Sequence, residues 1–325
     1  MRLIGIEEHW TLDRVDGALR ALPPGILDDS LVLNDHGDTA ARLADLGQGR
    51  TSTMDLQGVD LQVLSLAPPG VQGVPAADAT SLCRDANDVA AATVRAHPSR
   101  FRAMATLPLA DPPAAAGELE RAAALGLTGA MVYGRVGDVP LDDPRFEDVW
   151  AVAARLRQPI FIHPQIPPHA IRDAAYGGLD RSSELALATF SWGWHVEAGA
   201  AALRLMTRGI LDRHPDLRLI LGHWGELLLF WHQRADSLAR VARLDRSITE
   251  YLQQNVWITA SGMLDPALLR HALAVTTPDR ILFSTDYPFQ SPTRHEVDDF
   301  LTNFADDESR IAFASENARK LFAIN

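Results

Sequence analysis

The sequence predicts an α/β fold, a (β/α)8 TIM barrel made by a single domain over residues 1–325, with long loops after the first and fifth strands. Eight short apolar runs recur along the chain, and each is followed by a polar, Gly-rich or Pro-rich break, which is typical of strands. Between them, apolar residues recur every three or four positions, which is typical of amphipathic helices. Runs such as residues 217–221 are apolar almost throughout, as expected for parallel strands that are buried on both faces.

The predicted elements alternate between strand and helix. The strands are residues 3–6, 59–66, 101–107, 129–133, 159–162, 217–221, 256–259 and 281–284. Helical periodicity marks residues 76–97, 113–125, 146–156, 184–213, 227–243, 266–273 and 309–322. Residues 11–58 and 165–181 exceed ordinary connections and are expected to form lids or substrate loops on one face of the barrel. An open doubly wound sheet is the alternative, but no Gly-x-Gly-x-x-Gly or P-loop pattern follows any strand.

The composition limits the function. The chain has 30 basic and 42 acidic residues, and its net charge of −12 opposes an extended surface for nucleic acid. Cys83 is the only cysteine, so neither an intrachain disulfide nor a Cys-based zinc cluster can form, and no apolar run reaches the length of a membrane span. We therefore expect a cytoplasmic protein with no nucleic-acid or membrane partner. Of the basic residues only Lys320 is a lysine, which leaves almost no candidate for lysine-based covalent chemistry.

The C-terminal strand ends, where the active sites of (β/α)8 barrels lie, carry metal-ligand residue types. Glu7 and His9 lie two positions apart at the end of the first strand, so both side chains leave on one face. His163 ends the fifth strand, and Asp286 follows the eighth. These four residues form a nitrogen and oxygen donor set suited to a catalytic Zn²⁺, Mn²⁺ or Fe²⁺ with positions left for water or substrate. Glu8 should point the other way and serve the structure.

A second pair of polar residues follows the sixth strand. His223 and Glu226 are three positions apart, where the strand turns into a helix, so Glu226 can orient the imidazole and set its tautomer. The alternative is that Glu226 only caps the start of the helix. The aromatic cluster Trp192-Gly193-Trp194-His195 is expected to pack near the site or in the core.

In their order and spacing these residues resemble the amidohydrolase superfamily. Within it they are most similar to the metal-dependent decarboxylases, which include the aminocarboxymuconate semialdehyde, γ-resorcylate and 2,3-dihydroxybenzoate enzymes. The resemblance covers essentially the whole chain. It rests on Glu7-Glu8-His9, where most amidohydrolases have His-x-His, and on matches at residues 63–66, 69–72, 141–146, 162–164, 221–226 and 284–289.

The resemblance implies one bound divalent metal ion, Zn²⁺ or Mn²⁺, with four ligands: Glu7, His9, His163 and Asp286. Binuclear relatives bridge their two ions with a carbamylated lysine at the end of the fourth strand. Here that strand ends in Met131-Val132-Tyr133-Gly134, which contains no lysine. A carbamate-bridged pair of metal ions is therefore excluded.

The resemblance also implies roles around the substrate. His223 would lie beside it, supported by Glu226. Arg234 matches an arginine that contacts substrate or crosses the subunit interface in relatives, and Phe289 matches an aromatic residue beside the substrate ring. Tyr133 stands where the resorcylate enzymes carry a smaller Asn, so it is expected to change which ring substituents are accepted.

The expected reaction is the non-oxidative decarboxylation of a hydroxylated, dihydroxybenzoate-like aromatic acid. The metal would chelate the carboxylate and the ortho hydroxyl, and Asp286 would protonate the ring carbon, with His223 as the alternative donor. A mononuclear hydrolase or hydratase acting on a lactone or related ring-cleavage product is the alternative, because the same residues support it. A non-catalytic, metal-containing binding protein is a third possibility. The expected partners are a small aromatic acid and further copies of the chain, in a homodimer or homotetramer.

Overall fold

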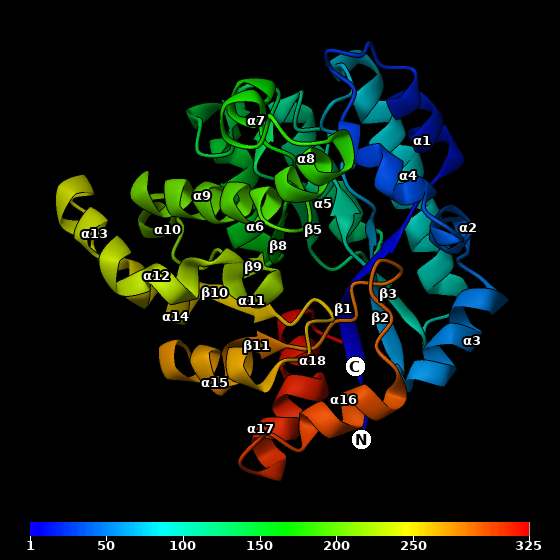
Figure 1. The fold of residues 1–325 in the computed structure, drawn as a ribbon, viewed down its shortest axis with the longest axis vertical. Coiled ribbons are helices and arrows are strands. Elements are labelled where there is room, and N and C mark those ends of the chain that lie inside the picture. Colours follow the sequence, from blue (N-terminus) through cyan, green and yellow to red (C-terminus); the bar gives the residue numbers. More distant parts are fainter. Residues whose placement is uncertain (325) are drawn as a thin grey trace.

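The computed structural model describes residues 1–324, in which strands lie at the centre and helices surround them (Figure 1). The barrel strands of this part of the chain are β1 (Ile4–Trp10), β2 (Leu61–Leu66), β3 (Phe101–Ala103) with β4 (Ala105–Thr106), β5 (Ala130–Tyr133), β8 (Ile160–His163), β9 (Leu219–Leu221), β10 (Val256–Thr259) and β11 (Ile281–Leu282). Each predicted strand has its counterpart, and their pairings are all parallel. The predicted (β/α)8 architecture is confirmed. A short antiparallel hairpin, β6 (Arg135–Val136) and β7 (Val139–Pro140), is added after β5.

Regular pairing does not run without interruption around the barrel. It forms a sheet of three strands, β1-β2-β3, and a sheet of six, β11-β10-β9-β8-β5-β4. One seam lies at Met104, where the predicted third strand breaks into β3 and β4. At the other seam β1 meets the end of β11 through single hydrogen bonds, from Ile6 N to Phe283 O at 3.2 Å and from His9 N to Tyr287 O at 2.7 Å. The candidate metal ligands lie on both sides of this second seam.

Apolar side chains fill two layers. Alternate strand residues pack inside the barrel, together with the C-terminal segment that includes α18 (Asn317–Leu321): Ile4, Ile6, Leu61, Val63, Met104, Met131, Phe161, Ile220, Leu282, Leu321 and Phe322. The other strand residues pack against the outer helices, so both faces of the strands are buried. This explains why the strand sequences are apolar almost throughout.

Several outer helices overlap the ranges that the apolar spacing predicts, although their ends differ. They include α4 (Ala76–Ala96), α5 (Pro112–Ala124), α6 (Glu147–Leu156), α9 (Gly193–Thr207), α15 (Pro266–Val275) and α17 (Asp307–Ile311). Two further helices, α14 (Ile248–Asn255) and α16 (Arg294–Leu301), were not predicted. Each starts with a capping box, formed by Ser247 with Glu250 and by Thr293 with Glu296.

The prediction of continuous helices over residues 184–213 and 227–243 is wrong. The first segment divides into α8 (Arg181–Ala188), α9 and α10 (Ile210–Arg213). The second segment follows α11 (His223–Glu226) and divides into α12 (Leu228–Ala235) and α13 (Ser237–Ala242). At Gly193 a Cβ atom would lie 2.4 Å from Ala188 O, so the chain can approach α8 this closely only with glycine. Gly209 adopts a φ of +71° and ends α9.

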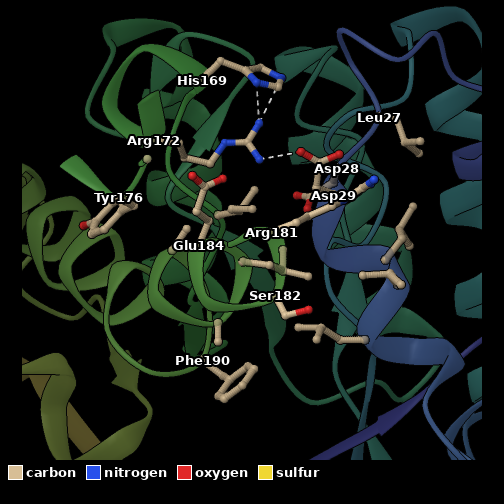
Figure 2. Close-up of a pocket in the computed structure, with 18 of the residues that line it drawn as sticks. Leu27, Asp28, Asp29, His169, Arg172, Tyr176, Arg181, Ser182, Glu184 and Phe190 are labelled. Carbon is tan, nitrogen blue, oxygen red and sulfur yellow. Dashed lines mark hydrogen bonds and ion pairs between the residues drawn. The ribbon is translucent and has the colours of Figure 1, made fainter. Parts of the chain in front are cut away.

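The two long loops lie side by side and enclose a cleft of about 1180 Å³ (Figure 2). The first contains α1 (Asp13–Arg20), the 3₁₀ helix η1 (Asp29–Asp35), α2 (Thr39–Ala44) and α3 (Gln48–Gln57), and the second contains α7 (His169–Ala175). Arg172 of α7 crosses the cleft and donates a hydrogen bond of 2.6 Å to Asp29 Oδ2 of η1. Among residues 1–324, no helix has both the length and the apolarity that crossing a bilayer requires.

Candidate metal centre and active site

A register shift in β1 directs the first two candidate ligands toward the site. Ile4 and Ile6 belong to the apolar cluster inside the barrel, and strict alternation would place Glu8 on that side next. The pairing of β1 with β2 shifts between Gly5 and Glu8, which reverses the alternation and brings Glu7 and His9 to the inner face. Residue types and spacing alone predict the shared face of Glu7 and His9, but not this irregularity.

Glu8 has the structural role expected of it. Its carboxylate accepts hydrogen bonds from Thr285 N at 2.9 Å and from Gln62 Nε2 at 3.0 Å. Burial raises the pKa of Glu8 to about 8, although the hydrogen bonds from Thr285 and the charge of Arg50 oppose this rise. Glu8 therefore fastens the segment after β11 to β1 and β2, next to the candidate metal ligands.

The four candidate metal ligands come together at the C-terminal ends of the strands. Glu7 Oε1 lies 3.8 Å from His163 Nε2, and His9 Nε2 lies 3.3 Å from Asp286 Oδ1. The potential ligand atoms of Glu7, His9 and His163 all lie within 4.8 Å of one another. Two atoms that bind one metal ion at about 2.1 Å lie at most about 4.2 Å apart, so the separations of 3.8 Å and 3.3 Å are compatible with ligands of one ion.

Hydrogen bonds to the remote nitrogens hold both imidazoles in the orientation that metal binding requires. His163 Nδ1 lies 2.7 Å from Pro164 O, which can only accept, so Nδ1 carries the proton and Nε2 presents its lone pair. Burial, and then the charge of His9, lower the pKa of His163 well below its ordinary value, which keeps the ring neutral. His9 Nδ1 is held by Ser65 Oγ at 3.2 Å, which directs Nε2 toward Asp286.

Glu7 is held in the same way through one of its two oxygens. Oε2 accepts hydrogen bonds from Thr259 Oγ1 at 3.0 Å and from Ser261 Oγ. Oε1 and His9 Nε2 are buried, and neither has a hydrogen-bond partner within residues 1–324. Buried polar atoms without partners are costly, and two of them facing the same point are explained by a cation between them. The residues present therefore fit a divalent metal ion.

His223 and Glu226 form the predicted pair. His223 Nδ1 donates to Glu226 Oε1 at 2.8 Å, and His223 Nε2 lies 4.0 Å from Asp286 Oδ2. Burial lowers the pKa of His223, but the charge and hydrogen bond of Glu226, followed by the charges of Glu7 and Asp286, outweigh burial and raise the pKa to about 10. His223 therefore presents an Nε2–H donor toward Asp286 at neutral pH.

The turn that carries this pair is strained. Residues 223–227 all have positive φ, from +46° at His223 to +87° at Gly225. Non-glycine residues pay roughly 1–2 kcal/mol each for this conformation, and such strain is concentrated at functional sites. The bond from His223 N to Ser261 Oγ, at 2.8 Å, holds the start of the turn.

Of the three predicted substrate-binding residues, two lie beside the metal ligands. The Tyr133 ring is buried 5.5 Å from the ring of His163, and its hydroxyl donates to Leu66 O at 3.2 Å. The half-buried Phe289 ring lies 5.6 Å from that of His9. Arg234 instead lies exposed on α12, and its side chain makes no hydrogen bond or ion pair with residues 1–324. Its contact with substrate stays a prediction.

Three residues hold the site together through contacts that the sequence did not predict. His195 contacts Glu226, while Thr259 and Ser261 hold Glu7. Thr259 and Ser261 lie two positions apart at the end of the seventh predicted strand, so the strand-end argument finds them when hydroxyls are considered beside ligand types. His195 belongs to the aromatic cluster that is expected to pack near the site or in the core, but no strand end or spacing signal marks its contact with Glu226.

The cleft between the long loops approaches the site from the side of His195. In residues 1–324, none of the four candidate metal ligands lines the cleft, but Phe190 does. The backbone oxygen of Phe190 accepts a 2.9 Å hydrogen bond from His195 Nε2. Arg172 and Asp29, one on each loop, are joined across the cleft in Figure 2.

The barrel and its buried Glu, His and Asp donors define the protein as a metal-dependent enzyme of the (β/α)8 class. Residues 19–324 match the protein family described as amidohydrolase. The chain therefore belongs to the amidohydrolase family.

Its curated relatives include decarboxylases. Decarboxylase orsB of Emericella nidulans is 36% identical over 306 residues, which are 90% of this chain and 87% of that protein. The γ-resorcylate decarboxylase of Rhizobium radiobacter is 34% identical over 340 residues, which cover 99% of this chain and 98% of that protein. Similarity to decarboxylases over nearly the whole length identifies the protein as a carboxy-lyase.

Solved structures agree with this assignment. The 5-carboxyvanillate decarboxylase of Sphingomonas paucimobilis superposes with a TM-score of 0.90 at 32% identity, covering 100% of this chain and 99% of that one. The dihydroxybenzoic acid decarboxylase of Polaromonas sp. JS666, solved with manganese and the inhibitor 2-nitroresorcinol, has a TM-score of 0.86 at 32% identity, covering 100% of this chain and 97% of that one.

Proposed function

We propose that the protein catalyses the non-oxidative decarboxylation of a dihydroxybenzoate-like aromatic acid. The observation that carries this proposal is the juxtaposition of a buried oxygen and nitrogen donor set with two aromatic rings. Tyr133 and Phe289 flank His163 and His9, so a flat ring can lie between aromatic surfaces while its acidic group faces the donors. The decarboxylase relatives support the same substrate class.

The proposed metal ligands are Glu7, His9, His163 and Asp286. Manganese is the proposed ion, with zinc as the alternative, because the Polaromonas enzyme was solved with manganese. When bound, the ion supplies a Lewis acid and a template for the carboxylate and the neighbouring hydroxyl oxygen of the substrate. The three hydrogen-bonded ligands keep their geometry through Ser65, Pro164, Thr259 and Ser261.

Asp286 is the proposed proton carrier. It accepts the proton that leaves the ortho hydroxyl and delivers it to the ring carbon that bears the carboxylate. The bond to the carboxylate then breaks, its electron pair returns to the ring, and carbon dioxide leaves. His223 Nε2 lies 4.0 Å from Asp286 Oδ2, and Glu226 orients the ring through Nδ1. In this orientation His223 donates a hydrogen bond that stabilises negative charge on the substrate oxygen.

The experiment offers the manganese-loaded protein a panel of 2,6-dihydroxybenzoate, 2,3-dihydroxybenzoate and 5-carboxyvanillate, and measures carbon dioxide together with the phenolic product. A panel of lactones serves as the comparison. We expect turnover of at least one aromatic acid and none of the lactones. Lactone opening without release of carbon dioxide would instead favour a hydrolase.

The Asp286→Asn variant tests the proton carrier. General acid–base groups contribute about 10²- to 10⁴-fold, so kcat should fall at least about 100-fold. Metal content is measured in the same sample, because Asp286 is also a proposed ligand. If Asp286→Asn keeps its metal and most of its turnover while His223→Asn does not, His223 is the donor.

We also propose that the protein forms a homodimer or homotetramer through α12 and α13, which extend away from the barrel (Figure 1). Phe230 and Trp231 stack with ring centroids 5.7 Å apart and are 71% and 62% exposed. Exposed aromatic patches of this kind mark interfaces, and Arg234 lies on the same helix. Light scattering should give two or four subunits for the wild type and a smaller assembly for Trp231→Asp.

The cytoplasmic location expected from the single cysteine stays a prediction.

A further inference from the structure

Glu226 is held by two imidazoles, not one. His223 Nδ1 lies 2.8 Å from Glu226 Oε1, and His195 Nδ1 lies 2.8 Å from Glu226 Oε2. Glu226 is 1% exposed, and each of its two oxygens accepts one of these bonds. Burial raises the pKa of Glu226, but the charge of His223 and the hydrogen bonds from His195 and His223 lower it below its ordinary value overall. The carboxylate is therefore ionised and doubly bound.

His195 is itself anchored at its other nitrogen. Nε2 lies 2.9 Å from the backbone oxygen of Phe190, in the turn between α8 and α9. Both ring nitrogens of His195 thus face oxygen acceptors, so the ring joins the turn to Glu226. Gly193, at the start of α9, permits this arrangement because a Cβ atom there would lie 2.4 Å from Ala188 O. The rings of His195 and His223 lie side by side, with centroids 4.6 Å apart, and each reaches a different oxygen of the carboxylate.

We propose that His195 is a positioning residue for the decarboxylation reaction: it fixes Glu226 so that His223 keeps its proton on Nδ1 and aims Nε2 at Asp286. This inference rests on the proposed function. A carboxylate held through one oxygen can rotate about its terminal bond and release the imidazole, whereas one held through both oxygens cannot. His195 binds the Glu226 oxygen that His223 leaves free. In residues 1–324 it makes no hydrogen bond with Asp286 or with another proposed metal ligand.

The geometry offers matched variants that separate the two bonds of His195. The amide nitrogen of asparagine reaches the place of Nδ1, so His195→Asn preserves donation to Glu226 and loses the bond to Phe190. The amide nitrogen of glutamine reaches the place of Nε2, so His195→Gln preserves the bond to Phe190 and loses donation to Glu226. His195→Leu removes both bonds while keeping an apolar side chain of similar bulk.

The expected result is a change in kcat rather than in KM. Loss of an outer partner of a catalytic group typically costs about 10- to 100-fold, so kcat of the manganese-loaded enzyme should fall at least about 10-fold in His195→Leu and His195→Gln. KM and metal content should stay within about threefold of the wild type, since His195 does not touch the metal ligands. His195→Asn should recover most of kcat. Equal losses in the Asn and Gln variants would overturn the proposal.

A spectroscopic measurement tests the same bond without turnover. In metal-free protein with ¹⁵N-labelled histidine, the Nδ1 proton of His223 should give a downfield resonance that persists in His195→Asn and is lost or shifted in His195→Gln. An unchanged resonance in His195→Gln would contradict the positioning role. If the wild type decarboxylates no aromatic acid but the resonance behaves as expected, the proposed function fails, whereas the positioning of Glu226 and His223 by His195 stands.

Discussion

Gly222 shows how closely the two parts of the site are packed. It follows β9 directly before the strained turn, and a Cβ atom there would lie 3.0 Å from Glu226 Oε1, 3.1 Å from Ser261 Oγ and 3.2 Å from Glu7 Oε1. The missing side chain therefore leaves room for the carboxylate of the proposed metal ligand Glu7 and for the carboxylate that orients His223. A single methyl group at this position would press on both.

We predict that Gly222→Ala lowers kcat/KM about 10-fold or more while the protein stays folded. The displaced groups are the proposed metal ligand Glu7 and the carboxylate that orients His223, and small misplacements of such groups are costly. Steady-state kinetics with the best substrate of the panel measures the loss. Gly117→Ala is the matched control: its Cβ meets no atom within 4 Å on helix α5, so activity should not change and stability should rise by about 0.5–1 kcal/mol. Wild-type activity in Gly222→Ala would show that the two carboxylates tolerate movement.

At the scale of residues, the sequence predicts the candidate metal ligands better than the hydrogen-bonding residues that hold the site in place. His163 and Asp286 are marked by residue type and by position at a strand end, and the structure brings them together with Glu7 and His9. The link from His195 to Glu226 depends on the turn between α8 and α9, whose geometry no spacing rule describes. Supporting contacts of this kind join segments distant in sequence, so they become visible only in the folded chain.

At the scale of elements, strands are predicted more accurately than helices. A strand buried on both faces has a nearly continuous apolar run that polar residues end sharply, and all eight were found. Helical periodicity continues across the break after Ala188, where Thr189 leaves the helical conformation with a φ of −112° and a ψ of −122°. The register shift in β1 is hidden for a related reason, because it depends on pairing with β2 rather than on residues 4–10 alone.

The contact between α6 and α10 provides a prediction at this scale. Glu147 starts α6, and its carboxylate accepts hydrogen bonds from Arg213 Nε at 2.7 Å and from His214 Nε2 at 2.9 Å, both at the end of α10. The hydrogen bond from Arg213 is the main cause that lowers the pKa of Glu147 to about 2; burial opposes it, and His214 adds to it. A lowered pKa means that this contact stabilises the fold above the unfolded-state pKa of 4.5 and loses its effect as pH falls toward about 2.

We therefore predict that Glu147→Gln lowers the free energy of unfolding by about 1 kcal/mol at pH 6, and by progressively less as pH falls below about 4.5. The small magnitude reflects solvent screening, since the carboxylate is 35% exposed. Urea unfolding of both proteins at several pH values measures the difference. Glu120→Gln, which removes an exposed ion pair with Arg155, is the control and should cost less than about 0.5 kcal/mol. A pH-independent cost of Glu147→Gln would contradict the assigned role of the charge.

At the scale of the whole molecule, the proposed metal centre lies across the seam of the barrel between β1 and β11. Glu7 and His9 belong to β1, and Asp286 follows β11, between which regular strand pairing is interrupted. Besides two backbone hydrogen bonds, this seam is held by Glu8 with Thr285 and by the approach of His9 to Asp286. His163 connects it to β8 on the far side of the site. One ion at this place would join three parts of the barrel that are distant in sequence.

Removing the metal should therefore loosen the seam as well as stop the reaction. A ligand at 100 times its Kd stabilises the folded state by about 2.7 kcal/mol, so chelation should lower Tm, and manganese should restore it in a concentration-dependent way. Hydrogen exchange should become faster in residues 4–10 and 283–288 of the metal-free protein, because Glu7 Oε1 and His9 Nε2 then lack a partner. Residues 256–259, in the regularly paired β10, provide the internal control and should change little. Uniformly faster hydrogen exchange along the chain would mean that the ion supports the fold as a whole. Unchanged exchange at the seam would mean that Glu8 and Thr285 close the barrel without the ion.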